Sequence, residues 1–133
     1  GGYLAAWLIA HEHRFAAAVV ERAYLDGRSF AGPSDIGWYF PAAAHGDNPD
    51  ARSPLLLVGQ VRTPTLVIHS LDDPMIPADP YRAIDWARVE RDGVVRRLIT
   101  PLGGHVGFHE RGNPLPWFVG QSVAFLAKPS GSL

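Results

Sequence analysis

The sequence predicts an α/β protein whose mostly parallel sheet is covered by helices on both faces. Two short apolar runs are continuous rather than alternating, which is typical of strands that are buried on both faces, and a third strand is predicted after them. Helical segments alternate with these runs, and alternating strands and helices form parallel sheets. The length of 133 residues allows one domain at most.

The first half of the chain contains a predicted helix, a strand and a long irregular segment. Residues 3 to 12 are rich in Ala and Leu, with apolar positions at helical spacing. The run FAAAVV, which begins at Phe15, predicts the first strand. Residues 24 to 54 carry Gly, Pro, Asp, Asn and Ser at frequent intervals, so we expect an irregular excursion with one or two helical turns.

The second half contains the other two strands. Residues 65 to 69, TLVIH, form a second continuous apolar run, and residues 94 to 100, VVRRLIT, are predicted to form the third strand. Residues 103 to 114 predict a loop, and residues 116 to 127 predict the last helix.

A further helix is predicted over residues 77 to 91, between the second and third strands. Asp79 is expected as its N-cap and Pro80 as its first helical residue, since both residue types favour those positions. Gly93 is expected to end it.

The composition excludes several classes of function. The chain has no cysteine, which excludes disulfides, a cysteine-ligated zinc site and a cysteine nucleophile. Twelve basic residues balance 13 acidic ones, unlike the basic surface that binds nucleic acid or anionic membranes. The longest apolar runs, about ten residues, are too short to span a bilayer. We expect a cytoplasmic protein that binds neither nucleic acid nor membrane and uses no metal or cofactor.

An acid and a histidine follow successive strands. Asp72 and Asp73 come directly after the second strand, and His105 follows the third after two glycines. Ligand sites of parallel sheets lie beyond the carboxyl ends of the strands. An acid followed by a histidine is the rear half of the Ser…Asp…His order of α/β hydrolases. In that arrangement the histidine takes the proton of the nucleophile, and the carboxylate fixes the histidine tautomer.

The nucleophile of such an enzyme is expected earlier, on a G-x-S-x-G turn between a strand and a helix. The chain opens with Gly1 and Gly2 before a predicted helix, which is how such a turn ends. Ser29, in GRSFAG, is the internal alternative, but no predicted helix follows it. These residues alone leave three origins of Gly1 open: a start after loss of Met, a remnant of cloning, or the rear part of a longer chain.

Several motifs occur together in a fixed order. They are GGYLAAWLIAHEHRFAAAVVERA, then FAGPSDIGWYF, then RSPLLLVGQVRTPTLVIHSLDDPMIP and a G-H loop. In this order they resemble the catalytic domain of the prolyl oligopeptidase family, in particular its acylaminoacyl-peptidase and dipeptidyl-peptidase-like members. The resemblance covers residues 1 to about 105.

The resemblance implies a partial α/β-hydrolase fold. Residues 1 to 128 would be the C-terminal part of the catalytic domain, starting just after the nucleophile turn, and residues 129 to 133 a polar tail. The whole protein would be a serine peptidase whose serine lies two positions before Gly1, so we expect this chain alone to be inactive.

The resemblance also implies roles for particular residues. Asp73 matches the acid of the triad and His105 its base. An aromatic region matches the wall of the pocket for the residue on the acyl side of the cleaved bond; its residues are Phe30, Ile36, Trp38 and Tyr39.

Two departures keep alternatives open. Asp73 is followed by Pro74 and Met75, where the family often has an arginine two residues after the acid, and the segment after His105 is closer to that of esterases. The substrate could therefore be a peptide, an acyl-peptide or an ester. A non-catalytic, truncated or binding chain is the alternative from another class. Expected partners are the substrate, a second copy of the chain, or the missing N-terminal part.

Overall fold

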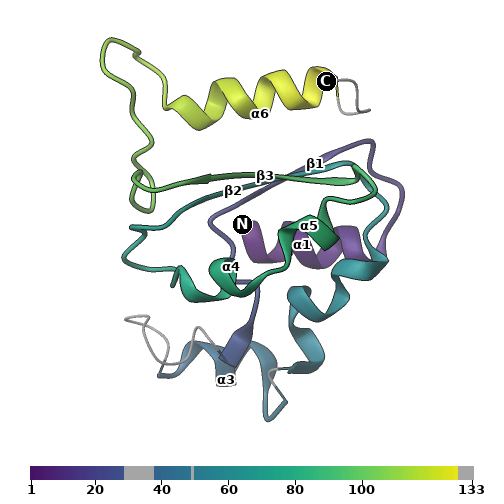
Figure 1. The fold of residues 1–133 in the computed structure, drawn as a ribbon. Coiled ribbons are helices and arrows are strands. Elements are labelled where there is room, and N and C mark those ends of the chain that lie inside the picture. Colours follow the sequence, from purple (N-terminus) through teal and green to yellow (C-terminus); the bar gives the residue numbers. More distant parts are fainter. Residues whose placement is uncertain (29–37, 49, 129–133) are drawn as a thin grey trace.

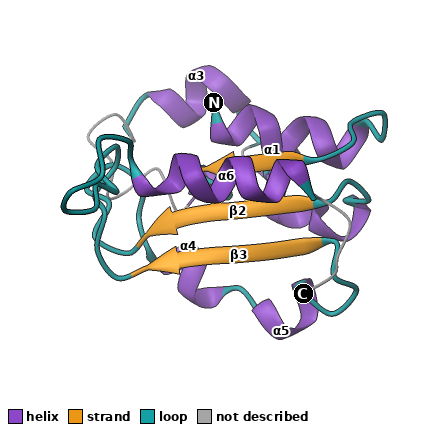
Figure 2. Cartoon of the chain, turned by 90° about the horizontal axis from the view of Figure 1, so that it is seen from above, coloured by secondary structure: helices purple, strands orange, loops and turns teal. Residues whose placement is uncertain are grey.

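The computed structural model describes residues 1–28, 38–48 and 50–128, which form a small parallel sheet between two layers of helices (Figures 1 and 2). The elements in chain order are α1 (Gly2–His11), β1 (Ala18–Glu21), α3 (Phe40–His45), η1 (Asp50–Arg52), η2 (Pro54–Gln60), β2 (Thr65–Ser70), α4 (Asp79–Ala83), α5 (Trp86–Val89), β3 (Val95–Thr100) and α6 (Trp117–Ala127). Here η denotes a 3₁₀ helix.

The three strands are parallel and lie in the order β1-β2-β3. Thr65 of β2 is opposite Ala18 of β1 and Val95 of β3. Every residue of β2 is buried. The continuous apolar runs therefore predicted the parallel sheet correctly, and the central strand is the one whose run is most completely enclosed.

The two faces of β2 pack against different layers. Helix α6 covers one face, and α1, α4 and α5 cover the other (Figure 1). Leu66 and Ile68 pack in a cluster with Phe108 and Phe125, whereas Val67 packs in a cluster on the opposite face. Alternate side chains of a strand point to opposite faces, so an unbroken apolar run serves both layers. The second cluster also contains Ile9, Tyr81, Trp86 and Val95.

The predicted helix over residues 77 to 91 is wrong as one element, because it is broken into α4 and α5. Ile84 is extended, with ψ of 128°, and the Asp85 side chain accepts a hydrogen bond from the Arg88 backbone N–H, which caps a new helix. The break lets the buried Trp86 donate its indole N–H to the carbonyl of Tyr81 at 2.8 Å.

The predicted N-cap of this region is also displaced by one residue. Ala78 is the N-cap of α4, so Asp79 is its first helical residue and Pro80 its second. Both residues still suit their positions, since an acid and a proline are both favourable in the first turn of a helix.

The first strand is shorter than its apolar run. The run begins at Phe15, but pairing begins at Ala18, opposite the first residue of β2. Phe15 instead packs, partly buried, against the core. The length of the partner strand therefore sets where β1 begins.

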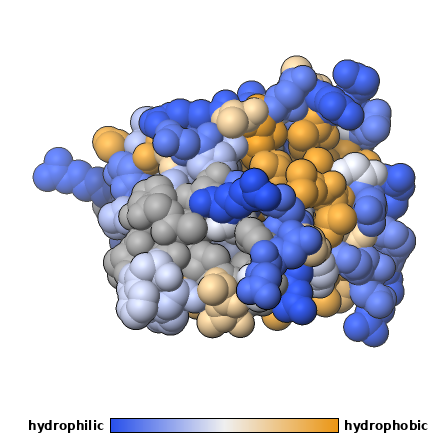
Figure 3. Space-filling model, turned by 90° about the horizontal axis from the view of Figure 1, so that it is seen from below, coloured by the Kyte–Doolittle hydropathy of each residue, from blue (hydrophilic) through white to orange (hydrophobic). Residues whose placement is uncertain are grey.

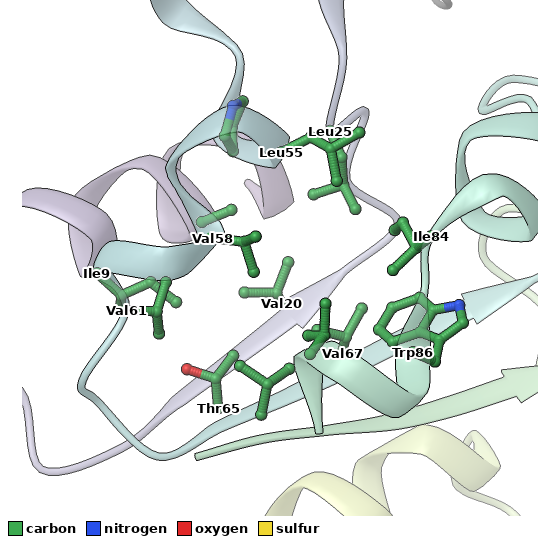
Figure 4. A pocket seen from close by; sticks show the side chains of 14 residues that line it. Ile9, Val20, Leu25, Leu55, Val58, Val61, Thr65, Val67, Ile84 and Trp86 are labelled. Carbon is green, nitrogen blue, oxygen red and sulfur yellow. The ribbon is translucent and has the colours of Figure 1, made fainter. Parts of the chain in front are cut away.

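A cavity of about 60 Å³ lies under the sheet, between α1, η2 and α5 (Figure 4). Its lining is apolar and includes Ile9, Leu25, Val58 and Trp86. Apolar residues also gather at the surface of this side of the molecule (Figure 3). Because Thr65 and Val95, the first residues of β2 and β3, line it too, the cavity lies toward the amino ends of these strands.

No helix of the described residues is long and apolar enough to cross a membrane.

Candidate active site

Asp73 and His105 lie in contact beyond the carboxyl ends of β2 and β3. The Nδ1 atom of His105 is 2.8 Å from Oδ2 of Asp73 and 3.1 Å from Oδ1. The Asp73 side chain is fully buried, whereas 27% of the His105 side chain is exposed. No hydrogen bond within the described residues engages Nε2 of His105, so this nitrogen is free to exchange a proton with a bound group.

The turn after β2 fixes the Asp73 carboxylate. Its Oδ1 accepts hydrogen bonds from the backbone N–H groups of Met75, at 2.8 Å, and Ile76, at 3.0 Å. An aspartate that binds the backbone two residues ahead forms a local turn, and a charged acceptor strengthens these bonds. The orientation of the carboxylate is therefore fixed by its own turn, independently of its contact with the imidazole.

Asp72 connects the end of β2 to the loop that carries His105. Its Oδ1 accepts from the Gly104 backbone N–H at 2.8 Å and from the Ser70 hydroxyl at 2.7 Å. These bonds, the one from Gly104 first, hold the pKa of Asp72 below its ordinary value. Gly104 has φ of +61°, a conformation that glycine adopts without strain. Sequence reasoning missed this role of Asp72, although the Asp-Asp doublet was visible.

The start of α1 lies beside His105. Gly1, Gly2 and His105 line one pocket of about 520 Å³, together with Glu21 and Arg22 at the end of β1. A Cβ atom on Gly2 would lie 2.0 Å from the carbonyl oxygen of Glu21. Only glycine allows the first turn of α1 to approach the strand end this closely. Glu21 and Arg22 form an ion pair at 2.9 Å.

These features join the ends of three strands and the start of a helix around one histidine. Residues 1–131 match the model of the prolyl oligopeptidase family. The chain belongs to this family. Its peptidase relatives and the solved structures below make it a peptidase-like domain with part of the α/β-hydrolase fold.

Three relatives show the extent of the likeness. The uncharacterized peptidase YuxL of Bacillus subtilis (strain 168) is 35% identical over 86 residues, which is 59% of this chain. An acylaminoacyl peptidase of Pyrococcus horikoshii matches 96% of this chain at 28% identity and a TM-score of 0.74. An acylaminoacyl peptidase in complex with Z-Gly-Gly-Phe-chloromethyl ketone matches 85% at 31% identity and a TM-score of 0.65. The chain spans only 13% of YuxL and 22% and 19% of the two structures.

The aromatic residues assigned by resemblance to the substrate pocket are only partly described in this family member. Phe30 and Ile36 lie outside the described residues, as does Ser29. Trp38 and Tyr39 are 81% and 44% exposed, and their rings pack on each other with centroids 4.6 Å apart. In the part of the chain that the structure describes, no hydrogen bond or ring contact joins them to Asp73 or His105. Their role stays a prediction.

Within residues 1–28, 38–48 and 50–128, no group of three or more histidine or acidic residues is placed to hold a metal ion.

His69 is a buried histidine beneath the acid turn. It is fully buried at the end of β2, and its ring stacks on Tyr81 with centroids 3.8 Å apart. Its place at a strand end predicts a hydrogen-bonded structural residue, but this prediction is wrong: neither ring nitrogen has a hydrogen-bond partner among the described residues. Burial lowers the pKa of His69 to about 4.

This buried histidine predicts a pH dependence of stability. In the unfolded chain His69 takes up a proton near pH 6.5, but in the folded protein only near pH 4. The unfolded state therefore binds more protons between these values, so stability is complete above pH 6.5 and falls by about 3 kcal/mol as pH drops to 4. His69→Phe keeps the ring stacked on Tyr81 and should flatten this part of the curve of unfolding free energy against pH. The exposed His13→Gln should leave the curve unchanged, and an unaltered slope in His69→Phe would contradict the assignment.

Proposed function

We propose that this chain is the rear part of a serine peptidase of prolyl oligopeptidase type. In the complete protein Asp73 and His105 would serve a serine two positions before Gly1. The observation that carries the proposal is the contact between a buried carboxylate and a partly exposed imidazole, at 2.8 Å, beside the Gly-Gly start of α1. The boundaries proposed for the domain are residues 1 to 128, with a tail from 129 to 133.

The proposed reaction is acyl transfer in two steps. Nε2 of His105 accepts the proton of the serine hydroxyl while the serine oxygen attacks the scissile carbonyl carbon. The same nitrogen then protonates the leaving amine, and an acyl-enzyme remains. Water, deprotonated by His105, attacks the acyl carbon, the bond to the serine oxygen breaks, and His105 returns the proton to that oxygen as the acid is released. Asp73 holds Nδ1–H, so Nε2 is the nitrogen that carries the lone pair, and the carboxylate stabilises the imidazolium that forms.

The missing parts of this machinery are assigned to the segment before Gly1. The oxyanion donors of such enzymes are the backbone N–H of the residue after the nucleophile and one from an earlier loop. The outer edge of β1 pairs with no strand among the described residues, and we assign a strand of that preceding segment to it. The isolated chain is accordingly proposed to be inactive.

An ester substrate is the second candidate. It is favoured by Pro74 and Met75, which stand where many family members have an arginine that follows the acid. Without that cation the site has one charged group fewer with which to hold a peptide carbonyl or carboxylate.

The activity can be tested with matched substrates. The complete protein should hydrolyse N-acylated peptide p-nitroanilides, whereas the 133-residue chain should hydrolyse none. A matched series of p-nitrophenyl esters distinguishes the esterase: kcat/KM for the esters would exceed that for the anilides by more than the intrinsic difference in reactivity. No turnover of either series by the complete protein would contradict the proposed function and favour a non-catalytic binding chain.

A further inference from the structure

We propose that Arg22 is a positioning residue that holds the backbone of His105 in place for proton transfer. The inference rests on the proposed function for its catalytic consequence, but the contact itself can be tested independently of activity.

The guanidinium of Arg22 reaches across the sheet to the histidine loop. Its Nη1 donates a hydrogen bond to the backbone carbonyl of His105 at 3.2 Å, over a separation of 83 residues. Two glycines precede His105, so this stretch of backbone has little intrinsic rigidity. Asp73 binds the imidazole, and Asp72 binds the backbone N–H of Gly104. The hydrogen bond from Arg22 fixes a third point of the loop, the backbone carbonyl of His105.

The guanidinium is itself fixed on two further sides. Its Nη2 pairs with Glu21 at 2.9 Å, and its carbon lies 5.0 Å from the ring centroid of Phe118. The second oxygen of Glu21 accepts a hydrogen bond from Ser122 of α6 at 3.2 Å. Only 22% of each side chain of the pair is exposed, which limits screening by water. One guanidinium thus connects the end of β1, helix α6 and the loop of His105.

The backbone at Arg22 also indicates a role for this side chain. Its φ is +50°, in the left-handed region that glycine occupies without cost and that other residues rarely occupy. The Arg22 N–H donates to the carbonyl of Ile68, and the next carbonyl, of Ala23, accepts from the Tyr81 hydroxyl, so neighbours hold this conformation on both sides. A strained residue that persists where glycine would fit is a sign of function.

The kinetic test uses the complete protein. Arg22→Gln should lower kcat by about 10- to 100-fold with little change in KM, because the histidine is misplaced while the substrate pocket is not. Arg22→Lys should restore part of kcat, since an ammonium can pair with Glu21 but cannot engage two acceptors in the fork geometry of a guanidinium. Arg22→Gly relieves the backbone strain and should lose kcat without a lower unfolding temperature. This variant therefore separates positioning from folding.

Arg97→Gln is the matched control. Arg97 also pairs with a glutamate, Glu90 at 3.6 Å, and also lies over an aromatic ring, that of Trp86 at 5.2 Å. Within the described residues, no hydrogen bond or ion pair joins it to the histidine loop. Its removal should leave kcat unchanged.

A spectroscopic readout does not depend on turnover. The proton between Nδ1 of His105 and Asp73 should give a low-field NMR resonance that is sharp in the wild type and in Arg97→Gln and broadened in Arg22→Gln. An unchanged resonance in Arg22→Gln would overturn the proposal whatever happens to kcat. If the wild type hydrolyses no substrate, the proposed function fails, but the resonance still decides whether Arg22 holds the loop.

Discussion

His105→Ala is expected to lower kcat of the complete protein by about 10⁴-fold, with Asp73→Asn close behind it. The alanine would remove the imidazole proposed to accept and return the proton, and the asparagine would remove the carboxylate proposed to select the histidine tautomer. Both should be measured as kcat on an acyl-peptide anilide, with KM determined in parallel.

Two further variants test this interpretation. The double variant should lose scarcely more activity than His105→Ala alone, because the two residues act as one unit. His109→Gln changes an exposed histidine four residues further along the same loop and should retain wild-type kcat. Near-normal turnover in either His105→Ala or Asp73→Asn would refute their assignment as base and acid.

Gly2→Ala is expected to have the largest effect on stability, destabilising the protein by about 3 kcal/mol or more. The added Cβ would lie 2.0 Å from the Glu21 carbonyl oxygen and 2.9 Å from the Ala23 backbone nitrogen. Both are backbone atoms, which cannot rotate away as a side chain would. Either the start of α1 or the end of β1 must move, and both border the pocket of His105. Guanidinium unfolding of the complete protein measures the cost.

Gly120→Ala is the matched control for this substitution. Gly120 also lies in a helix, α6, but an added Cβ there meets no atom within 4 Å. Alanine is the better helix former by about 1 kcal/mol, so this variant should be as stable as the wild type or more so. If Gly2→Ala were equally harmless, the close approach of α1 to β1 would be contradicted.

The fold could be predicted from sequence wherever a pattern is continuous and local. The run TLVIH predicts β2 within one residue, because both of its faces are buried and every position is constrained. The break between α4 and α5 could not be predicted in this way. It depends on where the indole of Trp86 finds a carbonyl, and helix propensity alone favours one helix through Ile84.

The candidate site, too, could be predicted only where the sequence pattern is local. The order of acid and histidine after successive strands was enough to expect Asp72 or Asp73 beside His105, since strand ends meet at one edge of a parallel sheet. The choice of Asp73 came from the resemblance to the family. The roles of Asp72 and Arg22 depend on hydrogen bonds that span 32 and 83 residues to a glycine-flanked loop. No local pattern in the sequence encodes such contacts. The same holds for His69, which is completely buried against Tyr81 and has no hydrogen-bond partner among the described residues.

Covalent labelling of the complete protein with a fluorophosphonate, followed by peptide mapping, tests the central claim most directly. We predict a single adduct on a serine two residues before Gly1, in a peptide that continues into GGYLAAWLIAHEHR, and no adduct on the isolated 133-residue chain. An adduct on Ser29, or on no serine at all, would contradict the account.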